Sequence, residues 1–157
     1  MPGPTDFMAR AIEIARTAML ENGAAPFGAV VVRDGEIVGE GVNNVVNHHD
    51  PTSHGEVEAI RDAGRRTGSW DLSGCELYTS CEPCEMCVAA MYWARIDRFY
   101  YAATLTDCGE IGLDTAPLTA MVRADLHDRA LPAAQLLPAE CRDVLQLWSL
   151  LPGSDTF

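Results

Sequence analysis

Positive charge is scarce in this chain, whose 157 residues include 11 lysines and arginines against 23 aspartates and glutamates. The formal net charge is -12, and the isoelectric point is near 4.5. A protein that holds a phosphate backbone normally presents a basic surface, because neutralising the phosphates supplies much of the affinity. The only basic cluster, Arg61, Arg65 and Arg66, has Asp62 within it. The composition therefore argues against nucleic acid as a partner and favours a small, uncharged substrate.

Long apolar runs are missing as well, and no stretch has the length and hydrophobicity of a membrane-spanning helix. Residues 1–6 lack the basic and apolar regions of a signal peptide. Three of the six cysteines are bunched in a pattern typical of metal sites, which favours a reducing compartment over a disulfide framework. Cys75, Cys108 and Cys141 stand alone, and we expect them to pack as small apolar groups. The sequence thus predicts a cytoplasmic protein without a membrane anchor, folded as one domain over residues 1–157.

Apolar residues recur alternately at helical and at strand spacing, without repeats or a domain linker. The expected helices are one capped by Asp6, running through Met19 and stopped by Gly23, and three others at His54 to Gly64 or Gly68, Pro83–Ala94 and Glu140–Leu151, with a short helix in the loop 105–117. The expected strands are Phe27–Val32, Glu76–Thr79 and Arg98–Ala102, and the turn Asp34-Gly35 returns the first strand through Ile37 and Val38. Strands that alternate with helices are typical of a layered α/β domain around a central sheet.

Two short motifs carry most of the chemistry, namely His54-Gly55-Glu56 and Pro83-Cys84-Glu85-Met86-Cys87. Zinc takes nitrogen and sulfur ligands in a tetrahedral shell, and a catalytic site uses three protein ligands with the fourth place left for water. His54, Cys84 and Cys87 supply three ligands, and Glu56 is left over as a carboxylate. A water on the metal beside a free carboxylate is the equipment for hydrolysis at neutral pH. The pattern H-x-E followed by P-C-x-x-C is a known signature of the zinc nucleobase deaminases.

The local sequence suits such a metal site. Pro83 is expected in the first turn of a helix, where its missing N–H costs nothing. Cys84 and Cys87 then lie one turn apart on the same face, and the electropositive N-terminus of the helix favours the thiolate. We expect His54 and Glu56 in the first turn of another helix, pointing in different directions, so that one binds metal while the other handles protons.

Other interpretations of the cysteines stay open. A lone CxxC is also found as a redox pair or as half of a structural zinc site. Cys81, Cys84 and Cys87 could form a three-thiol site with His54 as the fourth ligand. That site would be closed, would need no Glu56 and would make the chain a non-catalytic zinc-stabilised module.

Several segments resemble the cytidine-deaminase-like superfamily and, within it, the bacterial guanine deaminase branch. They are Pro26–Val30, Gly41–Asn44, Asp50–Glu56, Thr79–Cys87 and Met91–Arg95. The zinc motif identifies only the superfamily, whereas the Asn-Asn pair, the Tyr-Trp-Ala-Arg run and the C-terminal aromatic point to the branch. The resemblance implies a three-layer α/β/α domain with a central mixed sheet. It also implies a homodimer whose subunits exchange the C-terminal segment, about residues 140–157, so that the last residues of one cover the active site of the other.

The resemblance also implies roles for matching positions. His54, Cys84 and Cys87 would hold one Zn²⁺ per chain, and Glu56 would shuttle protons. The expected substrate contacts are Phe27, Asn43, Gly55, Ser80, Trp93, Asp114 and Phe157.

Each expected contact has its own part. Asn43 would hydrogen-bond the edge of the base. Phe27, His54 and Trp93 would line the ring or stack against it. The Gly55 N–H would bond a ring carbonyl, and the Ser80 carbonyl would receive the leaving amine.

Two positions depart from the guanine deaminase pattern. Members of that branch carry two acidic residues in the loop that here reads Gly112-Leu113-Asp114-Thr115, and the second, expected to accept protons from guanine, falls on Thr115. The last aromatic is often tyrosine, but Phe157 has no hydroxyl. Losing a buried partner for a substrate N–H costs orders of magnitude in specificity. We therefore expect hydrolytic deamination of a free base, with guanine, isoguanine, a cytosine-like base or a triazine as candidates. The alternative is a deaminase of tRNA or nucleosides.

Overall fold

A four-stranded sheet with the strand order β2-β1-β3-β4 forms the centre of the first of two compact units. The units are Met1–Thr119 and Ala120–Phe157. The structure is a computed structural model that describes residues 2–153. The strands are β1 (Gly28–Arg33), β2 (Glu36–Val42), β3 (Cys75–Cys81) and β4 (Arg98–Ala103). The helices are α1 (Pro4–Asn22), α2 (Val45–His48), α3 (Gly55–Thr67), α4 (Glu85–Trp93), α5 (Leu105–Glu110), α6 (Ala116–Arg123) and α7 (Pro138–Ser149). Strand β1 pairs antiparallel with β2 and β3, and β3 pairs parallel with β4, so the sheet is mixed.

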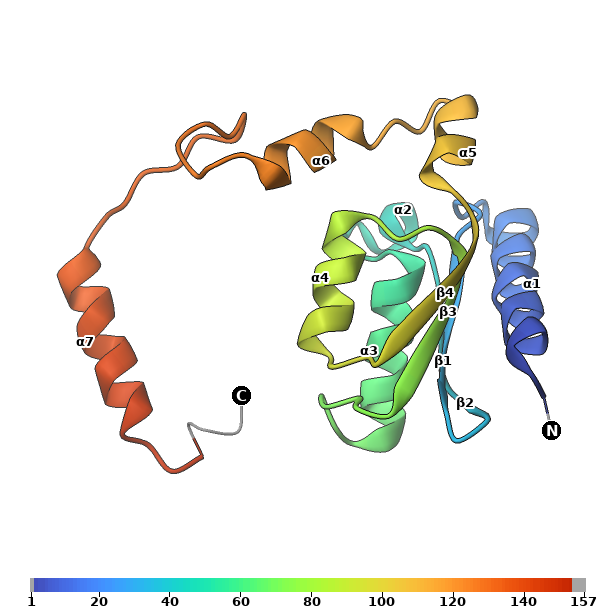
Figure 1. Ribbon diagram of the computed structural model, residues 1–157, viewed down its shortest axis with the longest axis horizontal. Helices are drawn as coiled ribbons and strands as arrows, with labels where there is room; N and C mark the ends of the chain where they lie inside the picture. The colour runs from blue at the N-terminus through green and yellow to red at the C-terminus, as the bar shows by residue number, and fades with distance from the viewer. Residues whose placement is uncertain (1, 154–157) are drawn as a thin grey trace. The chain divides into compact units, whose positions relative to one another are not determined.

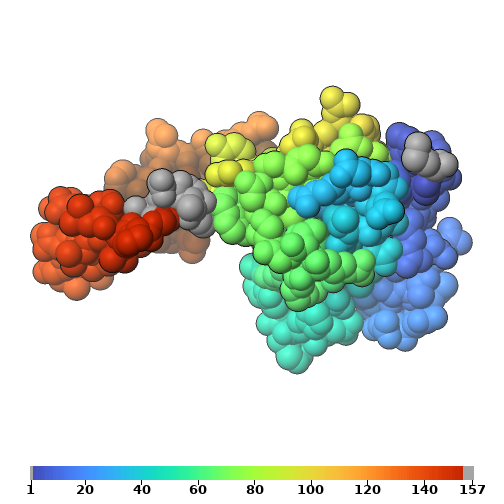
Figure 2. All heavy atoms as spheres, turned by 90° about the horizontal axis from the view of Figure 1, so that it is seen from below, coloured from blue at the N-terminus to red at the C-terminus, as the bar shows by residue number. Residues whose placement is uncertain are grey.

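Helices cover both faces of this sheet. Figure 1 shows α1 on one face and α3 with α4 on the other. In Figure 2 the light-blue atoms of the β1–β2 hairpin lie between the dark-blue atoms of α1 and green atoms from the middle of the chain. The central strands are therefore buried on both sides, and Ala29, Val30 and Val31 have no exposed surface. The predicted three-layer α/β/α fold with a central mixed sheet is confirmed.

Turn chemistry fixes the hairpin between β1 and β2 as predicted. Asp34 and Gly35 both have positive φ, at 53° and 80°. Such a two-residue turn matches the right-handed twist of the strands, and glycine adopts its second position without strain.

Two helices begin later than the sequence suggested. His54 and Cys84 have extended backbones, with ψ of 157° and 169°, and are the N-cap residues of α3 and α4 rather than members of their first turns. Pro83 therefore precedes the cap of α4. Helix α1 begins earlier than expected, because the Asp6 carboxylate accepts a hydrogen bond from the Gly3 N–H at 2.8 Å and stabilises an additional first turn.

The second unit builds no core of its own. None of its described residues, 120–153, is buried. Helix α7 nevertheless carries Val144, Leu147 and Trp148, which are 64%, 66% and 47% exposed. Among residues 2–153, no helix combines the length and apolar character needed to cross a bilayer.

Close packing of β2 against α3 generates a stability prediction. A Cβ on Gly39 would lie 2.5 Å from the Ala59 carbonyl oxygen and 2.6 Å from the Ala63 nitrogen, both backbone atoms that cannot move aside cheaply. We expect Gly39→Ala to lower the free energy of unfolding by about 1–3 kcal/mol, measured by urea denaturation.

The matched control is Gly109→Ala in α5, where a Cβ meets nothing within 4 Å. This substitution should leave stability unchanged or raise it by up to about 1 kcal/mol, because alanine is the better helix former. Equal effects of the two substitutions would contradict the β2–α3 packing.

Candidate functional site

Two helix N-termini meet at the edge of the sheet and bring three metal-ligating side chains together. His54 caps α3, Cys84 caps α4, and Cys87 lies one turn further along α4. The His54 Nδ1 atom is 3.7 Å from the Cys84 Sγ and 3.5 Å from the Cys87 Sγ. The two sulfur atoms are 3.7 Å apart.

These separations fit one tetrahedral ion. Zinc bonds of ordinary length at the tetrahedral angle place two sulfurs about 3.8 Å apart and a sulfur and a nitrogen about 3.6 Å apart. The three ligand atoms lie within 4.8 Å of one another, and they are the only such group among the residues that the structure describes. One imidazole and two thiols are also a donor set that zinc prefers. The residues present therefore fit zinc, and the predicted ligand triad converges.

The three ligand side chains shift one another's pKa values. The hydrogen bond between the Cys84 and Cys87 sulfurs, together with the nearby His54, lowers the pKa of Cys84 to about 4. The Cys84 thiolate and burial in turn raise the pKa of Cys87, because a second negative charge there is unfavourable. The hydrogen bond to Cys84 outweighs burial and raises the pKa of His54. A bound dication would stabilise both thiolates.

Glu56 lies beside the triad and is only 6% exposed. Its Oε1 accepts a hydrogen bond from the Thr79 hydroxyl at 3.0 Å, and its Oε2 accepts one from the Cys87 thiol at 3.4 Å. Burial is the main cause that raises the pKa of this carboxyl, against the opposing effect of its hydrogen bonds. Thr79, from strand β3, thus fixes the rotation of the carboxylate. The sequence gave no separate reason to single out Thr79, whose contact with Glu56 spans 23 residues.

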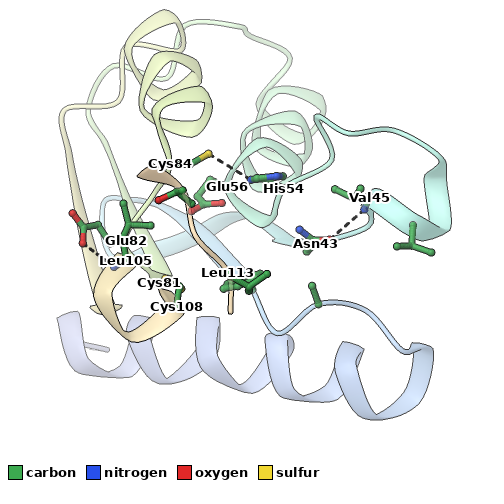
Figure 3. Close-up of a pocket in the computed structure, with 14 residues that line it drawn as sticks. Asn43, Val45, His54, Glu56, Cys81, Glu82, Cys84, Leu105, Cys108 and Leu113 are labelled. Atoms are coloured by element: carbon green, nitrogen blue, oxygen red, sulfur yellow. Dashed lines mark hydrogen bonds between the residues drawn. The ribbon is translucent and has the colours of Figure 1, made fainter. Parts of the chain in front are cut away.

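A pocket of about 370 Å³ opens in front of the triad and Glu56 (Figure 3). It is lined by Ala25, Phe27, Asn43, Val45, Val46, His54, Glu56, Cys81, Glu82, Cys84, Leu105, Cys108, Leu113 and Thr115. No arginine is among them. The Glu82 carboxylate accepts a hydrogen bond from the Leu105 N–H at 3.0 Å, so it is engaged at the start of α5. The rest of the wall offers apolar surface and two neutral polar side chains, Asn43 and Thr115.

Two of the predicted substrate contacts, Phe27 and Asn43, line this pocket. The backbone N–H of Asn43 donates to the Phe27 carbonyl at 2.8 Å, which joins the two residues. The side-chain Oδ1 of Asn43 accepts from the Val45 N–H at 3.3 Å. This bond turns the amide nitrogen of Asn43 toward His54, as Figure 3 shows.

Other predicted contacts lie elsewhere. The Trp93 side chain, at the end of α4, is 62% exposed and is not part of the pocket wall. Asp114 is exposed, and its carboxylate accepts from the Ala116 N–H at 2.9 Å at the start of α6. Its neighbours Leu113 and Thr115 face the pocket instead. Neither Trp93 nor Asp114 lines this pocket, so their predicted substrate contacts stay predictions, and Phe157 lies outside the described residues.

The remaining two predicted contacts lie close to the pocket without lining it. Gly55 is the first residue of α3 and packs against the backbone of Phe27, where a Cβ would be 3.0 Å from the carbonyl oxygen. The Ser80 hydroxyl accepts from the Gly28 N–H at 3.0 Å, which ties β3 to the start of β1. Their predicted backbone contacts with a substrate stay predictions.

The expectation for the isolated cysteines needs correction. Cys75 is buried in the core, as predicted, but Cys141 is exposed on α7. Cys108 is not isolated, because its Sγ lies 3.1 Å from that of Cys81. A helix–strand contact between residues 27 positions apart leaves no local signal in the sequence.

Residues 2–103 match the family described as the cytidine and deoxycytidylate deaminase zinc-binding region. The chain belongs to this family. The deaminase is also 42% identical over 142 residues to guanine deaminase of Bacillus subtilis (strain 168), a match that covers 90% of this chain and 91% of that protein. A crystal structure of guanine deaminase from Bacillus subtilis matches with a TM-score of 0.91 and 40% identity, covering 96% of each chain.

Among the relatives that match a smaller part of the chain is a tRNA-specific adenosine deaminase from Aquifex aeolicus. It is 41% identical over 101 residues, a match that covers 64% of this chain and 66% of that protein. A structure of guanine deaminase from Nitrosomonas europaea matches with a TM-score of 0.70 and 31% identity, covering 74% of this chain and 68% of that one. The predicted family resemblance and the predicted zinc dependence are confirmed.

The donor triad makes a prediction about metal content. Cys84→Ala should lose at least about tenfold in zinc affinity, because it removes one of three protein ligands. Cys81→Ser should keep about one zinc per chain, because the Cys81 sulfur contacts Cys108 and not the triad. Elemental analysis after dialysis against a weak chelator measures both, and zinc loss in Cys81→Ser would show the site to be a closed four-ligand one.

Proposed function

We propose that this deaminase hydrolyses the exocyclic amine of a free nucleobase, with guanine and related amino-oxo rings as its substrates, and releases ammonia. The observation that carries the proposal is the coincidence, in one pocket, of a zinc donor triad, a buried carboxylate beside it and a side-chain amide opposite. Relatives named as guanine deaminases that are 40–42% identical over at least 90% of the chain support the same substrate class, whereas a tRNA-specific adenosine deaminase from Streptococcus pyogenes that also covers 90% of the chain is 33% identical.

Zinc held by the triad supplies the Lewis acidity that makes a water molecule nucleophilic at neutral pH. Glu56 then carries the protons. Its Oε2 faces the triad, where it can accept the proton of the attacking water and return protons to the ring nitrogen and the leaving amine. Thr79 holds Oε1 and so keeps Oε2 aimed at the reacting atoms.

The pocket wall suits a neutral, flat ring. Without an arginine in the wall, nothing there compensates the charge of a nucleotide phosphate. The Asn43 amide nitrogen offers a donor to an oxo group, and Phe27 offers a face for the ring. Thr115 adds a hydroxyl that both donates and accepts, which suits an edge with adjacent oxo and amino groups.

A tRNA-directed activity is the second candidate, on the strength of the Aquifex aeolicus relative. It requires a surface that holds phosphates, and the net charge of -12 argues against one.

The test of the proposal is an ammonia-release assay with zinc-loaded protein over guanine, isoguanine, cytosine, amino-oxo triazines, the matching nucleosides and an adenosine-containing anticodon stem-loop. We expect turnover of at least one free base and a lower kcat/KM for its nucleoside. Activity confined to the RNA would overturn the proposal.

In the same assay Glu56→Gln should lower kcat by about 10²–10⁴-fold, because glutamine keeps the shape of glutamate but cannot accept a proton. The bound zinc should stay. Asp62→Asn is the matched control on α3, since Asp62 pairs with Arg66 and lies outside the pocket wall. Near-normal turnover in Glu56→Gln would rule out the proton-shuttle role.

The protein is further proposed to act in the cytoplasm as a homodimer with exchanged C-terminal segments. All six cysteines are free thiols, which suits a reducing compartment. The uncovered apolar side chains of α7 support the exchange, because such a helix face needs a partner surface. In this arrangement Phe157 of one subunit would close the pocket of the other.

Deleting residues 154–157 should leave the fold and zinc intact but lower kcat/KM at least about tenfold, because bulk water then enters the site. Mixing the deletion chain with Glu56→Gln chains should restore activity, since the heterodimer joins an intact Glu56 pocket to a full-length tail. Heterodimers without recovered activity would mean that the tail acts within its own subunit or not at all.

A further inference from the structure

Two thiols outside the metal triad face each other in the wall of the pocket. Cys81 ends strand β3 and Cys108 lies in α5, and Figure 3 labels them side by side below Glu56. Their sulfur atoms are 3.1 Å apart, and the residues are 5% and 7% exposed. Both line the pocket, so a small solute that enters it reaches them. Neither thiol has a part in the proposed deamination.

Backbone hydrogen bonds hold Cys81 and Cys108 close to each other. Cys81 is paired with Ala103 in the β3–β4 ladder, and the Cys108 N–H donates to the Thr104 carbonyl at 3.2 Å. Cys108 is the only buried residue of the short helix α5. A disulfide bond is about 2.05 Å long, so bonding requires the sulfurs to approach by about 1 Å. A surface helix anchored by one buried side chain can make that adjustment.

We propose that Cys81 and Cys108 form a redox modification site, at which hydrogen peroxide converts the two thiols into a disulfide in the pocket wall. One sulfur attacks a peroxide oxygen, the O–O bond breaks, and a sulfenic acid forms as water leaves. The other sulfur attacks the sulfenic sulfur, the S–O bond breaks, and a second water leaves. Two thiols thus lose two protons and two electrons, and one peroxide is reduced to two waters.

The disulfide acts on the pocket through α5. Drawing Cys108 toward Cys81 pulls α5 toward β3, and Leu105 at the start of that helix also lines the pocket. The pocket therefore narrows, and base hydrolysis slows. This consequence rests on the proposed function, whereas formation of the disulfide does not.

The test must distinguish oxidation of the metal-site thiols from oxidation of Cys81 and Cys108. Burial and the neighbouring Cys108 raise the pKa of the Cys81 thiol to about 12, whereas the pKa of Cys84 without metal is lowered to about 4. The thiolate is the reactive form, so Cys84 would react first in metal-free protein. The experiment therefore uses the zinc-loaded enzyme, in a Cys141→Ser background that removes the exposed thiol.

Zinc-loaded protein is treated with hydrogen peroxide, remaining thiols are alkylated, and peptides are mapped by mass spectrometry while a chromogenic chelator reports zinc release. We expect a Cys81–Cys108 linked peptide that has lost two hydrogen atoms, formed before zinc is released and reversed by dithiothreitol. Cys108→Ala and Cys81→Ser should each abolish the linked peptide, with circular dichroism as the check on folding. A Cys84–Cys87 link with parallel zinc release, or alkylation of Cys81 and Cys108 after long exposure, would overturn the proposal.

The activity measurement uses the ratio of kcat/KM for oxidised and reduced protein. This ratio should fall at least about tenfold in the Cys141→Ser protein, because a shift of about 1 Å in the groups that position the substrate can lower the reaction rate by orders of magnitude. In Cys108→Ala the ratio should stay near one under the same exposure. A linked peptide with an unchanged ratio would overturn control of the pocket, and lack of activity in both forms would instead count against the proposed function.

Discussion

Compensation of buried negative charge by one cation is the interaction on which the site depends. The ligands Cys84 and Cys87 and the carboxylate of Glu56 lie together in a part of the fold with little access to water. Like charges so close would repel strongly, which the opposite pKa displacements of the two cysteines display. A dication removes this conflict. The helix caps at His54 and Cys84 hold the ligands where the ion can do so.

The sheet supplies the rigidity that this arrangement needs. Glycines in β2 let α3 lie directly on the strand, because any side chain at Gly39 would meet the backbone of the helix. His54 caps α3 and Glu56 lies in its first turn, and Thr79 from β3 donates a hydrogen bond to the Glu56 carboxylate. The metal ligands and the carboxylate beside them are therefore held by three packed elements, α3, α4 and β3.

Local patterns in the sequence sufficed for the metal site and for much of the fold. The spacing of Cys84 and Cys87 predicted their shared face, and the Asp34-Gly35 turn predicted the hairpin. The sequence could not show that His54 and Cys84 are N-cap residues, because a cap differs from the first helical residue only in its ψ angle. Nor could it show the contact of Cys81 with Cys108, which sheet register and a short helix create across 27 positions. Resemblance alone predicted that Trp93 stacks on the substrate, and in the structure Trp93 is exposed and does not line this pocket.

X-ray absorption at the zinc edge of the purified, zinc-loaded protein tests the central claim most directly. The account predicts two sulfur scatterers at about 2.3 Å, one imidazole nitrogen at about 2.0–2.1 Å and one further light atom in a four-coordinate shell. Addition of a substrate base should alter only the light-atom shell. Three sulfur scatterers would mean that Cys81 closes the site, and the account of an open catalytic zinc with Glu56 as its proton carrier would then be wrong.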